Sequence, residues 1–475
     1  MIKNLLKDSF IYGVSKYLSA FAAIFLMPIY TRELSKADYG VMDLFNSWNS
    51  LLIMILPLGL ITSIFRFYHD FKKDPTERKN HLGTIFIAII ALSLIYLIIS
   101  ISFKDQFVNL IQHNQSEEIY YHSIFIVIGG TLLTYFLTIA QSKYEKYKYL
   151  ILSLVNLSLL ISLGFIFVHT LEMHAVGFFR ASTIALGSSL ILAIIFYRSD
   201  IVLIFKLKLL KRLLKYSVHI LSVGLLFGAT NLIDRYLLMQ YSGLEDVGIY
   251  SVGVRISSIL GLGISSFAIA WFPRAMQIKD DVELRDRTYS KVHNLYMVLA
   301  FFGVIALTLM RSEIIAIIAP QYQGSYNIIS ILCLSLVVNG AIYFYTLALH
   351  IKSKTKYLTF AAIISIMVNI IVSIFLLGLM GIDGVAWGTL AGGIVWVLIQ
   401  YYISNRFIRI KFNHLYPIVG LIGFTLVFIL SNLIDNLDLS LFITIPIKSV
   451  ILFVLLILII RRLNNKYDIR KLLSS

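Results

Sequence analysis

Long apolar stretches, each about as long as a bilayer-crossing helix, alternate along the whole chain with short polar segments. The stretches are continuously apolar, which excludes the alternating strands of a transmembrane β-barrel. Because hydrocarbon offers no partner to backbone polar groups, such stretches must be helices. The pattern predicts fourteen transmembrane helices, at residues 9–31, 41–67, 82–103, 119–142, 149–169, 173–197, 216–241, 247–272, 292–311, 325–350, 357–379, 383–405, 415–433 and 441–460.

The composition agrees with a membrane protein. Of the 475 residues, 59% are hydrophobic and 14% are charged, against roughly 25% charged residues in soluble domains. No polar stretch is long enough to form a soluble domain, and Cys333 is the only cysteine, so no disulfide forms within the chain. These properties exclude a soluble enzyme, a disordered chain and a disulfide-rich scaffold.

Most of the 41 Lys and Arg residues lie in the loops on the side of the membrane that holds the N-terminus. The loops of the opposite side hold only Arg32, Lys36, Lys104 and Arg311. The positive-inside rule therefore places the N-terminal side in the cytoplasm, and an even number of helices places the C-terminus there too. Most of the net charge of +16 is a topology signal, and it indicates no nucleic-acid partner.

A weak internal repeat recurs at an offset of about 208 residues. The pairs include Asp38 with Asp246, Gly40 with Gly248, Arg66 with Arg274, and Lys148 with Lys356. Duplicated halves are common in transporters, so the repeat predicts two six-helix lobes followed by two extra helices. The predicted parts are an N-terminal lobe (1–197), a cytoplasmic interfacial linker (198–215), a C-terminal lobe (216–411), and helices 13 and 14 with a basic cytoplasmic tail (412–475).

Three stretches resemble a known family: MPIYTRELSKADYG (27–40), NLIDRYLLMQYSGLEDVGIYSVGVRI (231–256) and WFPRA (271–275). They are similar to the polysaccharide transporter family, the Wzx-type flippases of the multidrug/oligosaccharidyl-lipid/polysaccharide exporter superfamily, whose fold is MATE-like. The resemblance implies a flippase of the bacterial cytoplasmic (inner) membrane. Its substrate would be an undecaprenyl-pyrophosphate-linked oligosaccharide, moved from the cytoplasmic to the outer leaflet for O-antigen, capsule or exopolysaccharide synthesis. A polysaccharide polymerase and chain-length machinery would be its partners.

Flipping requires a route through hydrocarbon for a charged pyrophosphate, and Arg suits phosphate because its planar fork donates two parallel hydrogen bonds. The predicted substrate-binding cavity is lined by cations. It is therefore assembled from basic residues within or at the ends of the predicted helices: Lys16, Arg66, Arg180, Arg255 and Arg274. The plainer interpretation of each is a topology anchor or a side chain that reaches the membrane surface. For Lys448 in the last helix, a structural or lipid-facing role is favoured.

Asp234 and Arg235 in predicted helix 7 form the coupling or ion-pair hypothesis. Asp234 would face the cavity and pair with Arg255 or bind H⁺ or Na⁺, and a structural ion pair between helices is the alternative. Asp43 would favour the N-terminus of predicted helix 2. Pro57 interrupts that helix and is either a hinge or the site of a static bend.

No catalytic motif is present: the sequence has neither HExxH nor GxxxxGK[ST], so we expect no metal, no nucleotide cofactor and no ATP hydrolysis. Two alternatives to a flippase stay open. An ion-coupled drug antiporter of the same superfamily usually has twelve helices. A membrane-embedded polysaccharide polymerase usually needs a large outer loop, and the longest outer segment here, 104–118, is short.

Overall fold

The computed structural model describes residues 26–68, 75–111, 113, 116–352, 354, 356–437 and 440–467. Within these residues nearly the whole backbone is helical and no β-strand occurs, so the predicted all-α class is confirmed. The chain divides into two compact units, Met1–Gly248 and Ile249–Ser475. The predicted lobe boundaries stay a prediction.

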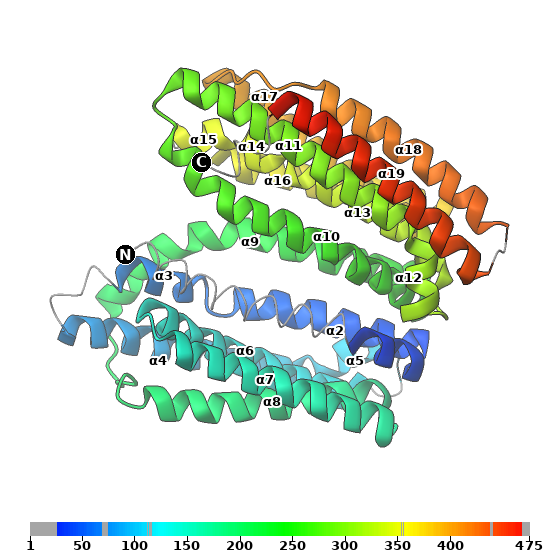
Figure 1. Cartoon of the computed structure of the whole chain (residues 1–475). Coiled ribbons are helices and arrows are strands. Elements are labelled where there is room, and N and C mark those ends of the chain that lie inside the picture. Colours follow the sequence, from blue (N-terminus) through cyan, green and yellow to red (C-terminus); the bar gives the residue numbers. More distant parts are fainter. Residues whose placement is uncertain are drawn as a thin grey trace. The chain divides into compact units, whose positions relative to one another are not determined.

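The first unit contains the helices from α2 to α9 and the start of α10 (Figure 1). Their bounds are α2 Lys36–Ile55, α3 Leu60–Phe67, α4 Pro75–Ser102, α5 Lys104–Ile111, α6 Ser116–Ser142, α7 Lys146–Phe165, the π-helical turn η1 Ile166–Thr170, α8 His174–Tyr197, α9 Leu207–Tyr241 and α10 Leu244–Gln277. Within this unit α2 packs on α6, α8 and α9, and α8 packs on α6 and α7.

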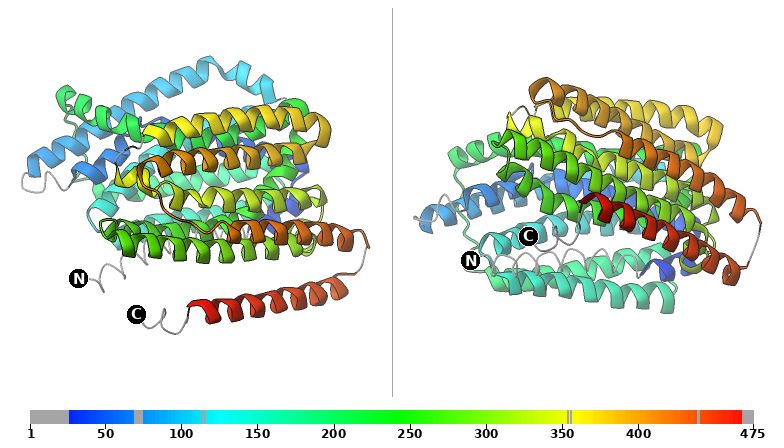
Figure 2. Two further views of the ribbon diagram at one scale, coloured as in Figure 1. Left: turned by 90° about the horizontal axis from the view of Figure 1, so that it is seen from above. Right: turned by 45° about the horizontal axis from the view of Figure 1, so that its top comes forward.

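The second unit contains the rest of α10 and the helices that follow it. Their bounds are α11 Val282–Leu309, α12 Arg311–Ile318, the 3₁₀ turn η2 Gln323–Ser325, α13 Tyr326–Gly340, α14 Ile342–Tyr345, α15 Leu347–Ile351, α16 Lys356–Met380, α17 Ile382–Phe407, α18 Leu415–Asp435 and α19 Leu441–Tyr467. The helices α13, α16 and α17 pack together, and α18 lies along α11. Figure 2 shows α19 at the margin of this bundle.

Among the described residues, ten helices are long and apolar enough to cross a membrane, or eleven if the bent pair α2–α3 counts as one span. Predicted helix 7 lies within α9 and predicted helix 14 within α19. Most of predicted helix 1 lies outside the described residues. A protein with many membrane spans is therefore established, and the count of fourteen stays a prediction.

Predicted helix 2 is broken at Pro57, and the two pieces, α2 and α3, are bent by 50°. Proline has no backbone N–H to continue the helix. Leu58 and Gly59 then adopt positive φ angles of 49° and 73°, and a Cβ on Gly59 would lie 2.7 Å from the Ser217 carbonyl oxygen. The bend at Pro57 is thus part of the fold, and a hinge movement about it stays a prediction.

The helix expected to begin at residue 216 begins at Leu207. The second half of the expected interfacial linker is therefore the first part of α9, and only residues 198–206 connect α8 to it without helix. The apolar, basic pattern of 207–215 continues into the hydrophobic run without a breaking residue, which explains the single long helix.

Two glycines at equivalent positions of the repeat, Gly40 and Gly248, lie against each other where α2 and α10 begin. A Cβ on Gly40 would lie 2.1 Å from the Leu244 carbonyl oxygen, and one on Gly248 would lie 2.1 Å from that of Lys36. These distances are shorter than any van der Waals contact, so only glycine allows the two backbones to approach so closely. The repeat seen in the sequence therefore includes a packing contact.

Candidate functional site

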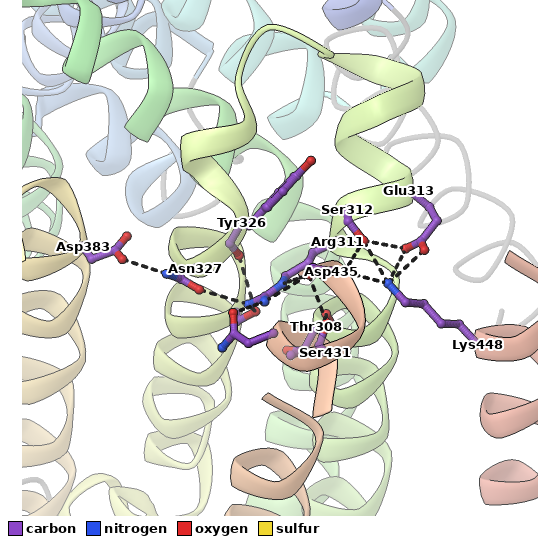
Figure 3. Close-up of polar contacts among 12 residues, drawn as sticks. Thr308, Arg311, Ser312, Glu313, Tyr326, Asn327, Asp383, Ser431, Asp435 and Lys448 are labelled. Carbon is purple, nitrogen blue, oxygen red and sulfur yellow. Dashed lines mark hydrogen bonds and ion pairs between the residues drawn. The ribbon is translucent and has the colours of Figure 1, made fainter. Parts of the chain in front are cut away.

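Arg311 is the largest fully buried side chain in the described part of the chain. It is the first residue of α12, and its guanidinium is held from three directions (Figure 3). Nε and Nη2 each donate to Asp435 Oδ2 at 3.2 Å, Nη2 donates to Asn432 Oδ1 at 2.6 Å, and Nη1 donates to Asn327 Oδ1 at 3.2 Å. The planar donor fork of arginine suits such a site, where each nitrogen has an acceptor.

Lys448 of α19 is also fully buried, on the other side of Asp435. Its Nζ lies 2.8 Å from Glu313 Oε1 and 3.0 Å from Asp435 Oδ1, and it donates to Ser312 Oγ at 2.8 Å. The predicted lipid-facing alternative for Lys448 is therefore wrong, and its structural alternative is confirmed. We refer to these five residues, Arg311, Ser312, Glu313, Asp435 and Lys448, as the Arg311 network (Figure 3).

The charges of the Arg311 network balance, with two cations and two carboxylates. An isolated buried charge costs several kcal/mol of desolvation, so these groups are tolerable inside the protein because each meets an opposite charge and further hydrogen bonds. Burial lowers the pKa of the Arg311 guanidinium and Asp435 opposes that shift, so the group stays charged at neutral pH. A contact from Asn327 Nδ2 to Asp383 Oδ2 at 2.9 Å extends the polar cluster to α17.

Four helices contribute to this arrangement because their ends converge. Arg311 begins α12, and only Met310 separates it from the end of α11. Asn432 and Asp435 are three residues apart in the last turns of α18, on one face of the helix. Ser431 fixes α18 to α11 by donating to the Thr308 carbonyl oxygen at 3.1 Å. The network therefore ties α18 and α19, the two helices outside the predicted lobes, to α11 and α12.

A cavity of about 440 Å³ borders the network. Its lining includes Arg311, Glu313 and Asp435, together with the amide side chains of Asn327 and Asn436. The Thr444 hydroxyl also lines it and has no hydrogen-bond partner among the described residues. The charged groups in its lining are one cation and two carboxylates, and this excess of negative charge disfavours a phosphate.

A second buried ion pair lies within the first unit. Arg235 Nε of α9 donates to Asp43 Oδ2 of α2 at 2.9 Å, and the side chains are only 5% and 9% exposed. Because α2 begins at Lys36, Asp43 lies two turns inside the helix, so the expected role at a helix N-terminus is wrong. Arg235 is therefore half of an ion pair between helices.

Asp234, next to Arg235, is also buried. It lies in the first unit and Arg255 in the second, so their predicted pairing stays a prediction. The coupling ion likewise stays a prediction. No cluster of three or more potential metal ligands occurs in the part of the chain that the structure describes.

The predicted cavity cations lie in different surroundings. Arg66, in the last turn of α3, and Arg274, near the end of α10, are exposed, and Arg274 donates to Gln277 Oε1 at 2.9 Å. Arg180 pairs with Glu118, with Nε donating at 2.8 Å. Arg255 is half-buried and lies about a third of the way along α10, and Lys16 lies outside the described residues. Among the described residues, the partners of Arg180 and Arg274 are Glu118 and Gln277, not another of these cations.

The Arg311 network was not predicted from the sequence, because Arg311 was expected to lie in a loop. Two signals were present: Lys448 interrupts an otherwise apolar run, and Asn432 and Asp435 share a helix face at the end of another. A charge inside an apolar span requires a partner, so these residues were candidates for a shared cluster. The sequence did not indicate that Arg311 belongs to this cluster, since Arg311 is 124 residues from Asp435.

A family model described as "Polysaccharide biosynthesis protein" matches residues 5–279, and a second model with the same description matches residues 318–445. No curated protein sequence matches the chain.

Among solved structures, the chain resembles the lipid II flippase MurJ in an inward closed conformation. The TM-score is 0.72 at 16% identity, with 96% of this chain and 99% of that chain covered. It also resembles a multidrug resistance MATE family transporter of the MOP superfamily. The inward-facing form has a TM-score of 0.67 at 14% identity over 83% of this chain and 94% of that chain. The outward-facing form has a TM-score of 0.57 at 15% identity over 84% and 95%. These TM-scores establish a shared fold.

Proposed function

Because this chain belongs to the polysaccharide biosynthesis protein family, we propose that it is a flippase for lipid-linked oligosaccharides and not an enzyme. The family match over residues 5–279 carries the proposal. The membrane-spanning, all-helical architecture and the fold shared with a lipid II flippase support it. We further propose that the substrate is an undecaprenyl-pyrophosphate-linked repeat unit of O-antigen, capsule or exopolysaccharide, moved from the cytoplasmic to the outer leaflet.

The physical task of such a protein is to lower the barrier for a pyrophosphate and a sugar to cross hydrocarbon. Cations that meet the pyrophosphate inside the protein replace part of its hydration, and alternating access by two lobes would expose them to each side in turn. Among the predicted cations, Arg255 fits this role best, because it lies several turns inside a membrane-spanning helix and is half-buried. Arg180 is a weaker candidate because it lies in the second turn of α8 and its side chain is 41% exposed.

The predicted topology completes the proposal. Both termini would lie in the cytoplasm, as the distribution of basic loops favours, and the protein would lie in the bacterial cytoplasmic membrane, as the family resemblance implies. Coupling to H⁺ or Na⁺ through Asp234, and association with a polymerase and chain-length machinery, belong to the same proposal. Reporter fusions at the two termini test the orientation directly.

The test is a knockout followed by leaflet-resolved analysis of lipid-linked glycans, complemented with wild type, Arg255→Ala, Arg255→Lys or the loop control Arg198→Ala. We expect full-length repeat units to accumulate in the cytoplasmic leaflet of the knockout. Arg255→Ala should clear them at least about tenfold more slowly than wild type, since charge-assisted hydrogen bonds of about 1.5–3 kcal/mol are lost. Arg255→Lys should retain part of the activity, and Arg198→Ala all of it.

Two outcomes would replace the proposal. Repeat units that reach the outer leaflet normally but stay unpolymerised would indicate a step after flipping, as for a polymerase. Normal glycans with altered drug tolerance would indicate an antiporter of the same superfamily.

A further inference from the structure

A second cavity of the second unit, of about 460 Å³, lies where α17 ends and α18 begins. Three basic side chains line it, Arg406, Arg409 and Lys411, and no acidic residue does. No ion pair involving these three occurs in the part of the chain that the structure describes. The cavity therefore carries an uncompensated positive charge. We refer to it as the cationic cavity.

The segment that presents these charges is held in place by its apolar residues. Residues 408–413 run without helix, and burial alternates along them: Ile410 and Phe412 are buried, whereas Arg409 and Lys411 between them are exposed. Phe412 packs against the rings of His293 and Tyr345, with centroids 4.8 and 5.2 Å away. Since successive side chains of an extended segment point to opposite sides, this anchor directs Arg409 and Lys411 outward together.

Aromatic hydroxyl and imidazole groups complete the lining. Tyr401 Oη lies 3.0 Å from His414 Nε2, and the Arg406 guanidinium lies 4.6 Å above the Tyr402 ring and contacts the Tyr402 hydroxyl. The negative end of the α17 dipole and the positive end of the α18 dipole meet here and largely offset one another. The side-chain cations therefore decide the sign of the cavity.

We propose that the cationic cavity binds a lipid-borne phosphate group. Arg side chains with hydroxyl donors match the chemistry of a phosphate, and a basic pocket between membrane helices on the cytoplasmic side suits an anionic head group. On the proposed topology the cavity lies at the cytoplasmic surface. The phosphate comes from one of two sources, an anionic phospholipid or the pyrophosphate of the lipid-linked substrate. The second source rests on the proposed function, and the first does not.

The positive-inside rule would also make this loop basic, whether or not it binds a phosphate. The control variant must therefore remove two positive charges from another loop on the same predicted side of the membrane. The double variant Arg409→Gln/Lys411→Gln changes two exposed residues two positions apart. Lys352→Gln/Lys354→Gln is its match, because both lysines are exposed, have the same spacing and lie in another predicted cytoplasmic loop of the same unit. The charge-retaining Arg409→Lys/Lys411→Arg variant tests for rescue.

The experiment measures lipid binding to the purified full-length chain by native mass spectrometry, with phosphatidylglycerol, undecaprenyl pyrophosphate and phosphatidylcholine as probes. We expect at least one anionic lipid to bind more tightly than phosphatidylcholine. The Arg409→Gln/Lys411→Gln variant should weaken that binding at least about tenfold, the Lys352→Gln/Lys354→Gln variant less than about threefold, and the charge-retaining variant should bind like wild type. Preference for phosphatidylglycerol would identify the phospholipid source, and preference for undecaprenyl pyrophosphate would identify the substrate.

Equal weakening by the two Gln double variants would overturn the proposal, because general surface charge would then explain the binding. Wild-type binding of phosphatidylcholine as tight as that of both anionic lipids would overturn it too. Neither result depends on transport. Failure of the cavity and failure of the flippase proposal are therefore distinguishable, since the latter is decided by the leaflet analysis.

Discussion

At the C-terminal end of α18, Arg311 and Lys448 are fully buried and each contacts a carboxylate, whereas at the N-terminal end Arg409 and Lys411 are exposed beside a cavity without an acidic lining residue. The 21 residues of α18 span about 30 Å, roughly the thickness of the hydrocarbon core. Basic residues of the same helical unit therefore have two different roles. Paired and buried, they join helices; unpaired and exposed, they remain available to an anion.

Removing a buried cation should have the largest effect. In Arg311→Ala the Asp435 carboxylate loses its guanidinium partner while still close to the buried Lys448, and we expect the free energy of unfolding to fall by about 3–5 kcal/mol. Unfolding of the purified protein in detergent, followed by heat or denaturant, measures it. A loss below about 1 kcal/mol would mean that water reaches the network and that burial does not make it stabilising.

The cationic cavity should depend on its apolar anchor. Phe412→Ala removes a buried ring that packs on His293 and Tyr345, and we expect the free energy of unfolding to fall by about 3 kcal/mol, as for other buried Phe→Ala changes. The same unfolding measurement applies, with Lys411→Gln, an exposed neighbour, as the control. A stable Phe412→Ala protein would show that the 408–413 segment is held by something other than this ring.

A double-mutant cycle on Lys448 and Glu313 sharpens the contrast. Each of Lys448→Met and Glu313→Gln leaves one charge of the pair without its partner, whereas the double variant removes both. We expect the double variant to be more stable than the sum of the two single effects by about 1–3 kcal/mol. Additive effects would show that the two groups do not interact in the folded protein.

The smallest effect on stability should come from the exposed cations. In Arg409→Gln/Lys411→Gln the free energy of unfolding should change by no more than about 0.5 kcal/mol, as for other surface substitutions. Raising the salt concentration should weaken anionic-lipid binding at the wild-type cavity, because exposed charges are screened, and should leave the stability contribution of the Arg311 network nearly unchanged. Comparable salt sensitivity of both quantities would erase the distinction between the two ends.

Much of the fold followed from local pattern. Apolar runs predicted most of the helices, and Pro57 lies at the observed break between α2 and α3. The repeat pointed to Gly40 and Gly248, which meet in the structure. Local pattern failed at element boundaries: nothing in the basic run 207–215 breaks a helix, so α9 begins earlier than the hydrophobic stretch alone suggests.

The sequence by itself determined the membrane class, the order of the helices, the distribution of basic loops and the family resemblance, because each depends on residue types and on near neighbours along the chain. Only the tertiary structure decided the state of each charge. Lys448 and Glu313 are 135 residues apart, and Arg235 and Asp43 are 192 apart. Whether a basic residue is buried in an ion pair or left exposed depends on which distant carboxylate the packing brings within about 3 Å, where desolvation and pairing energies are decided.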